Sequence, residues 1–282
     1  MLFVAPVLVG GFGNRVFTLW AALHYAIKTK RKFVLIKDHI DKSHHEPDKD
    51  VLNYLETLFF PFTYFYGDYK SWEIFEETPQ TEFMYIKPPI FEGHSVLFKG
   101  YFQNPQYFPD TPYKPIRYKK IYKNTYFLHI RLGDYKTHDH FQIPIIPYYN
   151  LAIRSIQKND KNARFLIFSN ENNLAEDFIK KNIKEAFQYE FSKARTSYET
   201  LYEMSCCVGA VCANSSLSWL GAYYQSLPRT QIYMPRPWIK THLNADIYPT
   251  WVNIIDTNEK GADIVTKSKQ SMVNLGVLIT TN

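Results

Sequence analysis

The sequence has few cysteines. Only three of its 282 residues are cysteine, and they lie close together as Cys206, Cys207 and Cys212. An odd number in so short a stretch excludes a disulfide framework and predicts buried, reduced thiols. No second cluster of Cys or His has matching spacing, so we expect no metal site built on these thiols.

Long apolar runs are also missing. No window approaches the roughly 18 uninterrupted apolar residues that a membrane-spanning helix needs. Residues 1–9 are apolar but too short, and without basic neighbours, for a signal peptide, so they predict a first strand. We therefore expect a cytoplasmic protein without a membrane span of its own.

The sequence has no basic stripe. Its 33 Lys and Arg residues exceed its 27 Asp and Glu residues, which gives a formal net charge of +6 and a pI near 8.9. The basic residues are spread along the chain, however, as on an ordinary solvated surface. We expect no nucleic-acid partner; a nucleic-acid binder, the weaker alternative, would show a steep salt dependence of binding.

The hydrophobic pattern predicts an α/β fold. Residues 2–9 form a candidate strand and residues 10–13 a tight loop, after which apolar residues recur at helical spacing and residues 33–36 form a second strand. A strand-helix-strand unit implies a parallel sheet. A helix is also expected at Val51–Phe59, and residues 61–120 give no clear pattern.

The same alternation returns in the second half. The expected strands are residues 126–130, 164–168, 187–191, 208–213 and 231–234, the last of them being the final strand. Helices are expected between them, one beginning with a capping box of Thr196 and Glu199. We place a domain boundary near residue 120, which predicts an N-terminal α/β domain (1–120) and a C-terminal α/β domain with a tail (121–282).

Three loops follow predicted strands, where open α/β sheets bind ligands. In the first, Gly10–Arg15, glycines allow close backbone approach, and the helix behind offers free N–H groups to an anion. It fails as a dinucleotide fingerprint because Val16 stands where the third glycine would be. A plain tight turn is the alternative.

The second loop belongs to the segment His129–Asp134. Strand alternation places His129 and Arg131 on one face, and an Arg at a strand end can meet a phosphate with two parallel N–H bonds. Asp134 would orient that Arg or accept a proton. The alternative is a structural Arg-Asp pair near the surface.

The third loop is Asn214–Trp219. Ser215 or Ser216 is expected to cap the following helix, and the same hydroxyl and N–H groups could bind a phosphate. Elsewhere, Asp48-Lys49-Asp50 is formally an Asp-x-Asp metal motif, but Asp50 is better explained as a helix cap. The histidines at 44, 45, 138 and 140 are interpreted as solvated loop residues.

Taken together, these segments resemble the α-1,2-fucosyltransferases, glycosyltransferase family 11. The opening is similar to the family's Gly-Gly-x-Gly-Asn-Gln, and His129–Tyr135 to its His-x-Arg-Arg-Gly-Asp-Tyr. Further matches follow in the expected order: Gly100-Tyr101-Phe102-Gln103 with Tyr107-Phe108, Phe168-Ser169-Asn170-Glu171, Tyr202-Glu203-Met204-Ser205 and Asn214–Ala222. Three positions depart from the family pattern: Arg15, Leu132 and Asn170.

The resemblance implies a GT-B fold of two Rossmann-like α/β domains facing a cleft, with the acceptor side in residues 1–120. It implies an inverting transfer of L-fucose from GDP-fucose to a glycan hydroxyl, with no metal and no cofactor. Catalytic roles fall to Arg131, Asp134 and His129, with His138 and Asp139 as further candidates for the base. The implied donor-binding residues are Gly11, Gly13, Asn14, Arg15, Ser169, Glu199, Asn214, Ser215, Ser216 and Ser218.

Other functions stay open at this point. One is a transferase for another nucleotide-activated deoxyhexose, or for a protein hydroxyl; Leu132 and Arg15 leave the donor undecided. Another is a catalytically silent carbohydrate-binding relative, because a fold alone does not establish activity. The retained Arg131 favours an enzyme.

Overall fold

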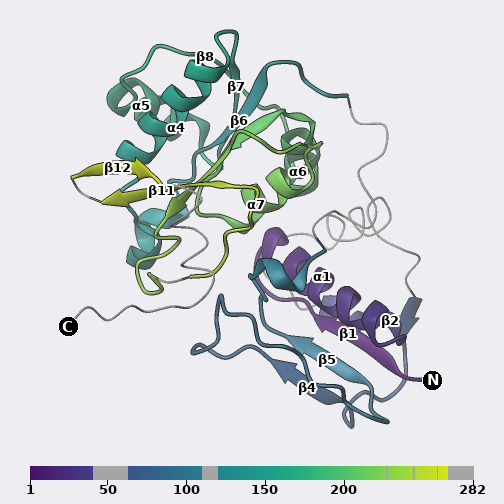
Figure 1. Cartoon of the computed structure of the whole chain (residues 1–282). Helices are drawn as coiled ribbons and strands as arrows, with labels where there is room; N and C mark the ends of the chain where they lie inside the picture. Colours follow the sequence, from purple (N-terminus) through teal and green to yellow (C-terminus); the bar gives the residue numbers. More distant parts are fainter. Residues whose placement is uncertain (41–62, 110–119, 227, 244, 259, 266–282) are drawn as a thin grey trace, which may run out of the picture. The chain divides into compact units, whose positions relative to one another are not determined.

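The structure is a computed structural model that describes residues 1–40, 63–109, 120–226, 228–243, 245–258 and 260–265 (Figure 1). Backbone contacts divide the chain into two compact units. Unit 1 comprises residues 1–122, 192–207 and 215–226, and unit 2 comprises residues 123–191, 208–214 and 227–282. A single boundary near residue 120 therefore does not describe the division, because two later segments pack with unit 1.

Unit 1 is built on a parallel sheet of five strands in the order β3-β2-β1-β5-β4. The expected strand-helix-strand unit at its start is confirmed, and Figure 1 shows α1 lying along this sheet. Its elements are β1 (Phe3–Val7), α1 (Phe12–Lys28), β2 (Lys32–Ile36), α2 (Lys37–Ile40), β3 (Thr63–Phe65), β4 (Glu73–Glu76), β5 (Val96–Lys99), a 3-10 turn (Pro105–Tyr107), α6 (Ser197–Cys206) and α7 (Ser216–Tyr223).

An aromatic cluster joins α1 to α7 inside unit 1. The rings of Phe17 and Trp219 lie 4.8 Å apart, and Phe108 lies 4.7 Å from Phe17 and 5.2 Å from Trp219. Trp20 Nε1 donates to the hydroxyl of Tyr224 over 3.0 Å. Large rings bury much apolar area, so this cluster explains why residues 215–226 pack with the first 122.

Unit 2 contains a sheet of seven strands in the order β12-β11-β10-β9-β6-β7-β8. All neighbours are parallel except the hairpin of β11 and β12. Its elements are β6 (Thr125–His129), two 3-10 turns (Asp134–Thr137 and Asp139–Phe141), α4 (Ile145–Asn159), β7 (Arg164–Phe168), α5 (Asn172–Asn182), β8 (Gln188–Phe191), β9 (Gly209–Val211), β10 (Ile232–Arg236), β11 (Asn253–Asn258) and β12 (Gly261–Ile264).

The core of unit 2 lies between this sheet and α4. One face of this expected helix is buried, with Ala152, Ile153 and Ile156 at 0% exposure against Leu128 and Ile167 of the sheet. The two parallel sheets confirm the α/β class and the pair of Rossmann-like units expected of a GT-B fold.

Several local expectations have a clear outcome. Thr196 and Glu199 form the predicted capping box, and all three cysteines are buried thiols that form no disulfide. The strand at residues 232–236 is not the last, because β11 and β12 follow it. Four of the six residues of β11 are polar, so its strand character depends on pairing with β10 rather than on an apolar run.

Some expectations fall elsewhere. Val51–Phe59, Asp48, Asp50, His44 and His45 lie outside the described residues. Among the described helices, none has both the length and the apolar character that crossing a membrane would require.

Tyr148 provides a test of how unit 2 is held together. Its hydroxyl is fully buried and contacts two carbonyl oxygens, those of Cys212 (2.6 Å) and Tyr233 (2.8 Å). Tyr148→Phe removes the donor and leaves buried acceptors short of a partner, so we expect about 1 to 3 kcal/mol less free energy of unfolding. Urea denaturation measures it, with the exposed Tyr66→Phe as control. Equal midpoints for both variants would contradict this role.

Candidate functional site

In unit 2 the predicted residues gather at one edge of the sheet. Strands β9, β6 and β7 are parallel neighbours, so their carboxyl ends lie side by side. Arg131 follows β6, Ser169 follows β7 and Asn214 follows β9. Open α/β sheets bind ligands at this position. The structure therefore brings together three predicted residues that are far apart in sequence.

Arg131 is seated on an aromatic stack. Its guanidinium carbon lies 5.1 Å from the centre of the Tyr135 ring, a cation-π geometry. Tyr135 in turn stacks on Phe141, with ring centres 4.6 Å apart and planes inclined by 18°. The stack restricts where a half-buried, permanently charged side chain can point.

Asn214 ties the loop after β9 to this stack. The hydroxyl of Tyr135 donates to the Asn214 carbonyl over 2.7 Å. The Asn214 side-chain amide donates to the carbonyls of Phe141 (3.1 Å) and Trp238 (3.0 Å). Asn214 is 4% exposed, so its side chain mainly fixes the loops. It was predicted to bind the donor directly.

The loop after β7 lies against Gly133. A Cβ atom at position 133 would fall 1.7 Å from a carboxylate oxygen of Glu171 and 3.0 Å from Asn170 Nδ2. Ser169 Oγ accepts from the Glu171 backbone N–H over 3.1 Å. Leu132, where the family pattern has a second arginine, packs against the apolar core of unit 2. That position therefore supplies packing instead of charge.

The other predicted catalytic residues differ in setting. His129 is 4% exposed, and its carbonyl accepts from the buried Tyr149 hydroxyl over 2.7 Å. Asp134 begins a 3-10 turn, but its side chain lies outside what the structure describes. Asp139, a further candidate for the base, forms an ion pair of 2.8 Å with Lys240.

In unit 1 the starts of two helices meet. A Cβ at Gly13, in the first turn of α1, would fall 2.4 Å from Ser216 Oγ and 2.7 Å from the backbone N of Leu217 in the first turn of α7. The amino ends of both helices carry partial positive charge and unpaired N–H groups. Two such ends side by side favour an anion near them.

Asn14 links these helix starts to a third segment. Its Oδ1 accepts from Ser216 Oγ (2.7 Å) and from Gln103 Nε2 (2.8 Å). Thr18, one turn further along α1, donates to the carbonyl of Gly100 over 2.7 Å. The Gly100–Gln103 motif is thus part of the same cluster, although no single-residue role was predicted for Gln103.

Other predicted donor residues of unit 1 have structural partners. Arg15 is 1% exposed and its Nε donates to the carbonyl of Gly10 over 2.9 Å. Ser218 is fully buried and donates to the Ser215 carbonyl. Ser215 occupies the cap position of α7 but makes no capping bond through its side chain, so capping by a serine hydroxyl is wrong. Gly11 caps α1 through its extended backbone.

Glu199 is exposed, and its carboxylate is occupied locally. Oε2 accepts from the backbone N–H groups of Arg195 (2.7 Å) and Thr196 (3.3 Å). These contacts belong to the capping box of α6. The expected reach of Glu199 to a nucleoside remains a prediction.

Glu77 is a residue that sequence reasoning missed. Its Oε2 accepts from the backbone N–H groups of Tyr101 (2.8 Å) and Phe102 (3.1 Å), while Oε1 is buried and has no hydrogen-bond partner in the described part of the chain. Burial raises the pKa of the Glu77 carboxyl, an effect that the two N–H donors only partly oppose. No local pattern marks this residue, because its contacts are about 25 residues away in the chain.

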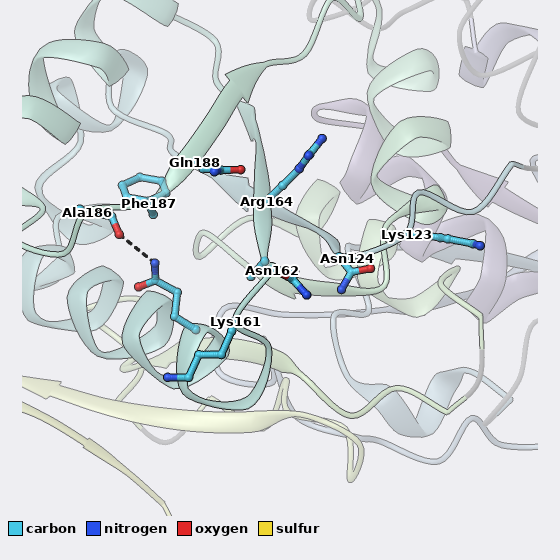
Figure 2. A pocket seen from close by; sticks show the side chains of 10 residues that line it. Lys123, Asn124, Lys161, Asn162, Arg164, Ala186, Phe187 and Gln188 are labelled. Atoms are coloured by element: carbon cyan, nitrogen blue, oxygen red, sulfur yellow. Dashed lines mark hydrogen bonds between the residues drawn. The ribbon is translucent and has the colours of Figure 1, made fainter.

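The described part of the chain offers no group of three or more His, Cys, Asp or Glu residues that could hold a metal ion. A pocket of about 720 Å³ lies elsewhere, at the amino ends of β6, β7 and β8 (Figure 2). None of the predicted site residues lines it. The candidate site and this pocket are therefore at opposite ends of the unit 2 strands.

Comparison with known proteins agrees with the motifs. The model of glycosyl transferase family 11 matches residues 122–254, so the resemblance to that family is confirmed. The matched range contains the loops after β6, β7 and β9.

Two curated relatives come from Escherichia coli. The O-antigen biosynthesis glycosyltransferase WbnK is 30% identical over 148 residues, covering 49% of this chain and 48% of that protein. An alpha-1,2-colitosyltransferase is 28% identical over 182 residues, covering 57% of this chain and 63% of that protein. The chain thus spans about half of the first relative and less than two thirds of the second. The solved structure of fucosyltransferase NodZ from Bradyrhizobium aligns with a TM-score of 0.46 at 11% identity, over 94% of this chain and 99% of that one.

Gly13→Ala tests the close approach of α1 and α7. The new Cβ would meet backbone atoms of Ser216 and Leu217, which cannot move as a side-chain tip can. We expect a loss of about 1 to 3 kcal/mol in the free energy of unfolding. Gly11→Ala is the matched control, because no atom lies within 4 Å of its added Cβ and its φ is −69°. Unfolding midpoints in urea that fall equally for both variants would rule out the helix contact as the cause.

Glu77→Gln tests the cost of the buried carboxylate. Because the folded-state pKa is raised, Glu77 favours the folded state most below its ordinary pKa of about 4.3, and this contribution is lost as the pH rises through the raised pKa. The neutral amide should therefore raise the thermal midpoint near pH 7 and flatten its pH dependence. Glu76→Gln is the control, since Glu76 is exposed and paired with Lys99. A midpoint below that of the unaltered protein near pH 7 would contradict the burial argument.

Proposed function

Because residues 122–254 match glycosyl transferase family 11, we propose that the chain is an inverting glycosyltransferase without a required metal ion or cofactor. It transfers L-fucose from GDP-fucose to a hydroxyl of a glycan acceptor. The observation that carries the proposal is the position of Arg131, at the carboxyl end of β6 and on the Tyr135 ring. The proposed partners are this nucleotide-sugar donor and the glycan.

The reaction explains why a braced arginine is needed. The acceptor oxygen forms a bond to C1 of the sugar while the bond from C1 to the diphosphate oxygen breaks, and the electron pair leaves with GDP. Negative charge grows on the departing diphosphate. A guanidinium held at that point binds the transition state more strongly than the bound donor, which lowers the barrier.

The proton of the acceptor hydroxyl needs a destination. We propose Asp134 as the general base, because it lies three residues after Arg131 at the same strand end. Asp139 is less suitable because its carboxylate is paired with Lys240. His129 is buried two residues before Arg131, and we propose that it positions Arg131 without taking part in proton transfer.

Unit 1 supplies a second anion-binding feature. The paired starts of α1 and α7, with Gly13, Asn14 and Ser216, offer N–H and hydroxyl groups to a phosphate. We propose that these groups contact the donor. Arg15 and Ser218 are proposed to stabilise the loops that carry them, since both side chains are buried and donate to backbone carbonyls.

A different donor is the alternative with a specific observation behind it. One relative is named an alpha-1,2-colitosyltransferase. Leu132 also replaces a charge of the family pattern with an apolar contact. Both facts favour testing GDP-colitose and other donors beside GDP-fucose. A protein hydroxyl as acceptor and a catalytically silent relative are the remaining alternatives.

A donor screen tests the proposal directly. Release of free nucleotide is followed with EDTA present for GDP-fucose, GDP-colitose, GDP-mannose, UDP-glucose and dTDP-rhamnose. Hydrolysis confined to GDP-fucose supports the donor and metal independence together. Turnover of a different donor alone would replace GDP-fucose in the proposal, and binding of sugars with no turnover of any donor would favour the silent relative.

Arg131→Ala tests the catalytic role. Removing one preorganised donor to developing charge costs about 3 to 4 kcal/mol, so we expect roughly a hundredfold lower turnover or more, with folding intact. Arg154→Ala is the control, because Arg154 is exposed on α4 and paired with Glu185. Steady-state kinetics measure both variants, and circular dichroism checks the fold. Near-normal turnover in well-folded Arg131→Ala would exclude the role.

A further inference from the structure

The pocket at the amino ends of β6, β7 and β8 carries an excess of positive charge. Lys123, Lys161 and Arg164 line it, and the residues that line it include no Asp or Glu. None of these three cations has an ion pair among the described residues. In the view of Figure 2, Asn124 and Asn162 lie between Lys123 and Lys161.

Four other basic side chains of unit 2 are neutralised by carboxylates. Ion pairs join Arg154 to Glu185, Lys180 to Glu176, Lys240 to Asp139 and Arg236 to Asp256. The three cations of the pocket have no such partner among the described residues. An anionic group in the pocket would gain charge-assisted hydrogen bonds without displacing a carboxylate.

Asp160, which lies next to Lys161 in the sequence, already accepts several hydrogen bonds. Asp160 accepts from Asn124 Nδ2 (3.1 and 3.2 Å), from the Tyr126 hydroxyl (3.1 Å) and from the Asn162 backbone N–H (2.9 Å). These three donors hold Asp160 in place. Its carboxylate stabilises the turn that leads into β7, and among the described residues no ion pair joins it to the three cations.

The rest of the lining suits a sugar. Gln157 donates through Nε2 to the Ala186 carbonyl (2.8 Å), which leaves its carbonyl oxygen for a ligand hydroxyl. Gln188 adds a second amide beside Arg164, its register partner on β7. Phe187 offers a half-buried ring, held 5.2 Å from Phe165. Amides bind hydroxyl groups, and aromatic faces bind the apolar faces of sugar rings.

From this combination we propose that the pocket binds an acidic oligosaccharide, a chain of sugars that carry carboxylates. Its volume of about 720 Å³ lies within the roughly 300 to 1,000 Å³ of small-molecule sites. The five residues of β7 separate it from the candidate site by roughly 15 Å, at about 3.3 Å per residue. Binding here is therefore separate from the chemistry at the other strand ends.

Calorimetric titration of the whole chain tests the proposal with three probes. Tetragalacturonate supplies sugars with carboxylates, maltotetraose the uncharged equivalent, and tripolyphosphate charge without sugar. We expect tetragalacturonate to bind most tightly and maltotetraose not measurably. Tripolyphosphate binding as tightly as tetragalacturonate would overturn the sugar assignment, and equal binding of both saccharides would overturn the acidic one.

Matched variants locate the site. Arg164→Gln removes a charged donor and should weaken tetragalacturonate binding about tenfold or more. Lys158→Gln is the control, because Lys158 is exposed near the same end of α4 but does not line the pocket. Equal weakening by both variants would show general attraction to a basic surface and overturn the proposal. These titrations measure binding alone, so their outcome does not depend on whether the protein turns over any sugar donor.

Discussion

The contact between Gly13 and the first turn of α7 is the constraint on which unit 1 depends. Without a side chain at position 13, the starts of α1 and α7 approach until backbone nearly meets backbone. That approach lets Asn14 accept from Ser216 and Gln103 at once, and it places the Phe17 and Trp219 rings in contact further along the two helices. Packing and the candidate phosphate-binding groups thus follow from the same missing Cβ atom.

In unit 2 an aromatic ring, that of Tyr135, positions the side chain of Arg131. A charged arginine at a strand end would sample many rotamers in water, and each lost rotamer costs entropy when a ligand binds. Tyr135 reduces that cost in advance, because its ring meets Arg131 while its hydroxyl is bonded to the loop after β9. Asn214 holds the opposite side of the same stack. The arginine is therefore positioned by residues from two strand ends.

Local pattern was enough to predict the elements whose signal lies within a short stretch of sequence. Helix α4, strand β7 and the capping box of α6 were predicted correctly because their period or cap chemistry lies within a few residues. Strand β11 was missed because its strand character comes from pairing with β10. Two of the three predicted loops, those after β6 and β9, begin at neighbouring strand ends, whereas the first belongs to unit 1. The sequence could not reveal that Arg15 is buried, that Leu132 packs in the core or that Glu77 reaches Tyr101, since each depends on distant neighbours.

The interleaving of the two units affects how the chain is made. The chain passes from one unit to the other after residues 122, 191, 207, 214 and 226. A ribosome delivers residues in order, so unit 1 has its sheet early but lacks α6 and α7 until residue 226 has emerged. Until then the α1 face that carries Phe17 and Trp20 lacks its contacts with Trp219 and Tyr224, and exposed apolar surface of this kind is prone to aggregate. Neither unit can be obtained by a single cut, so expression of the chain succeeds or fails as a whole.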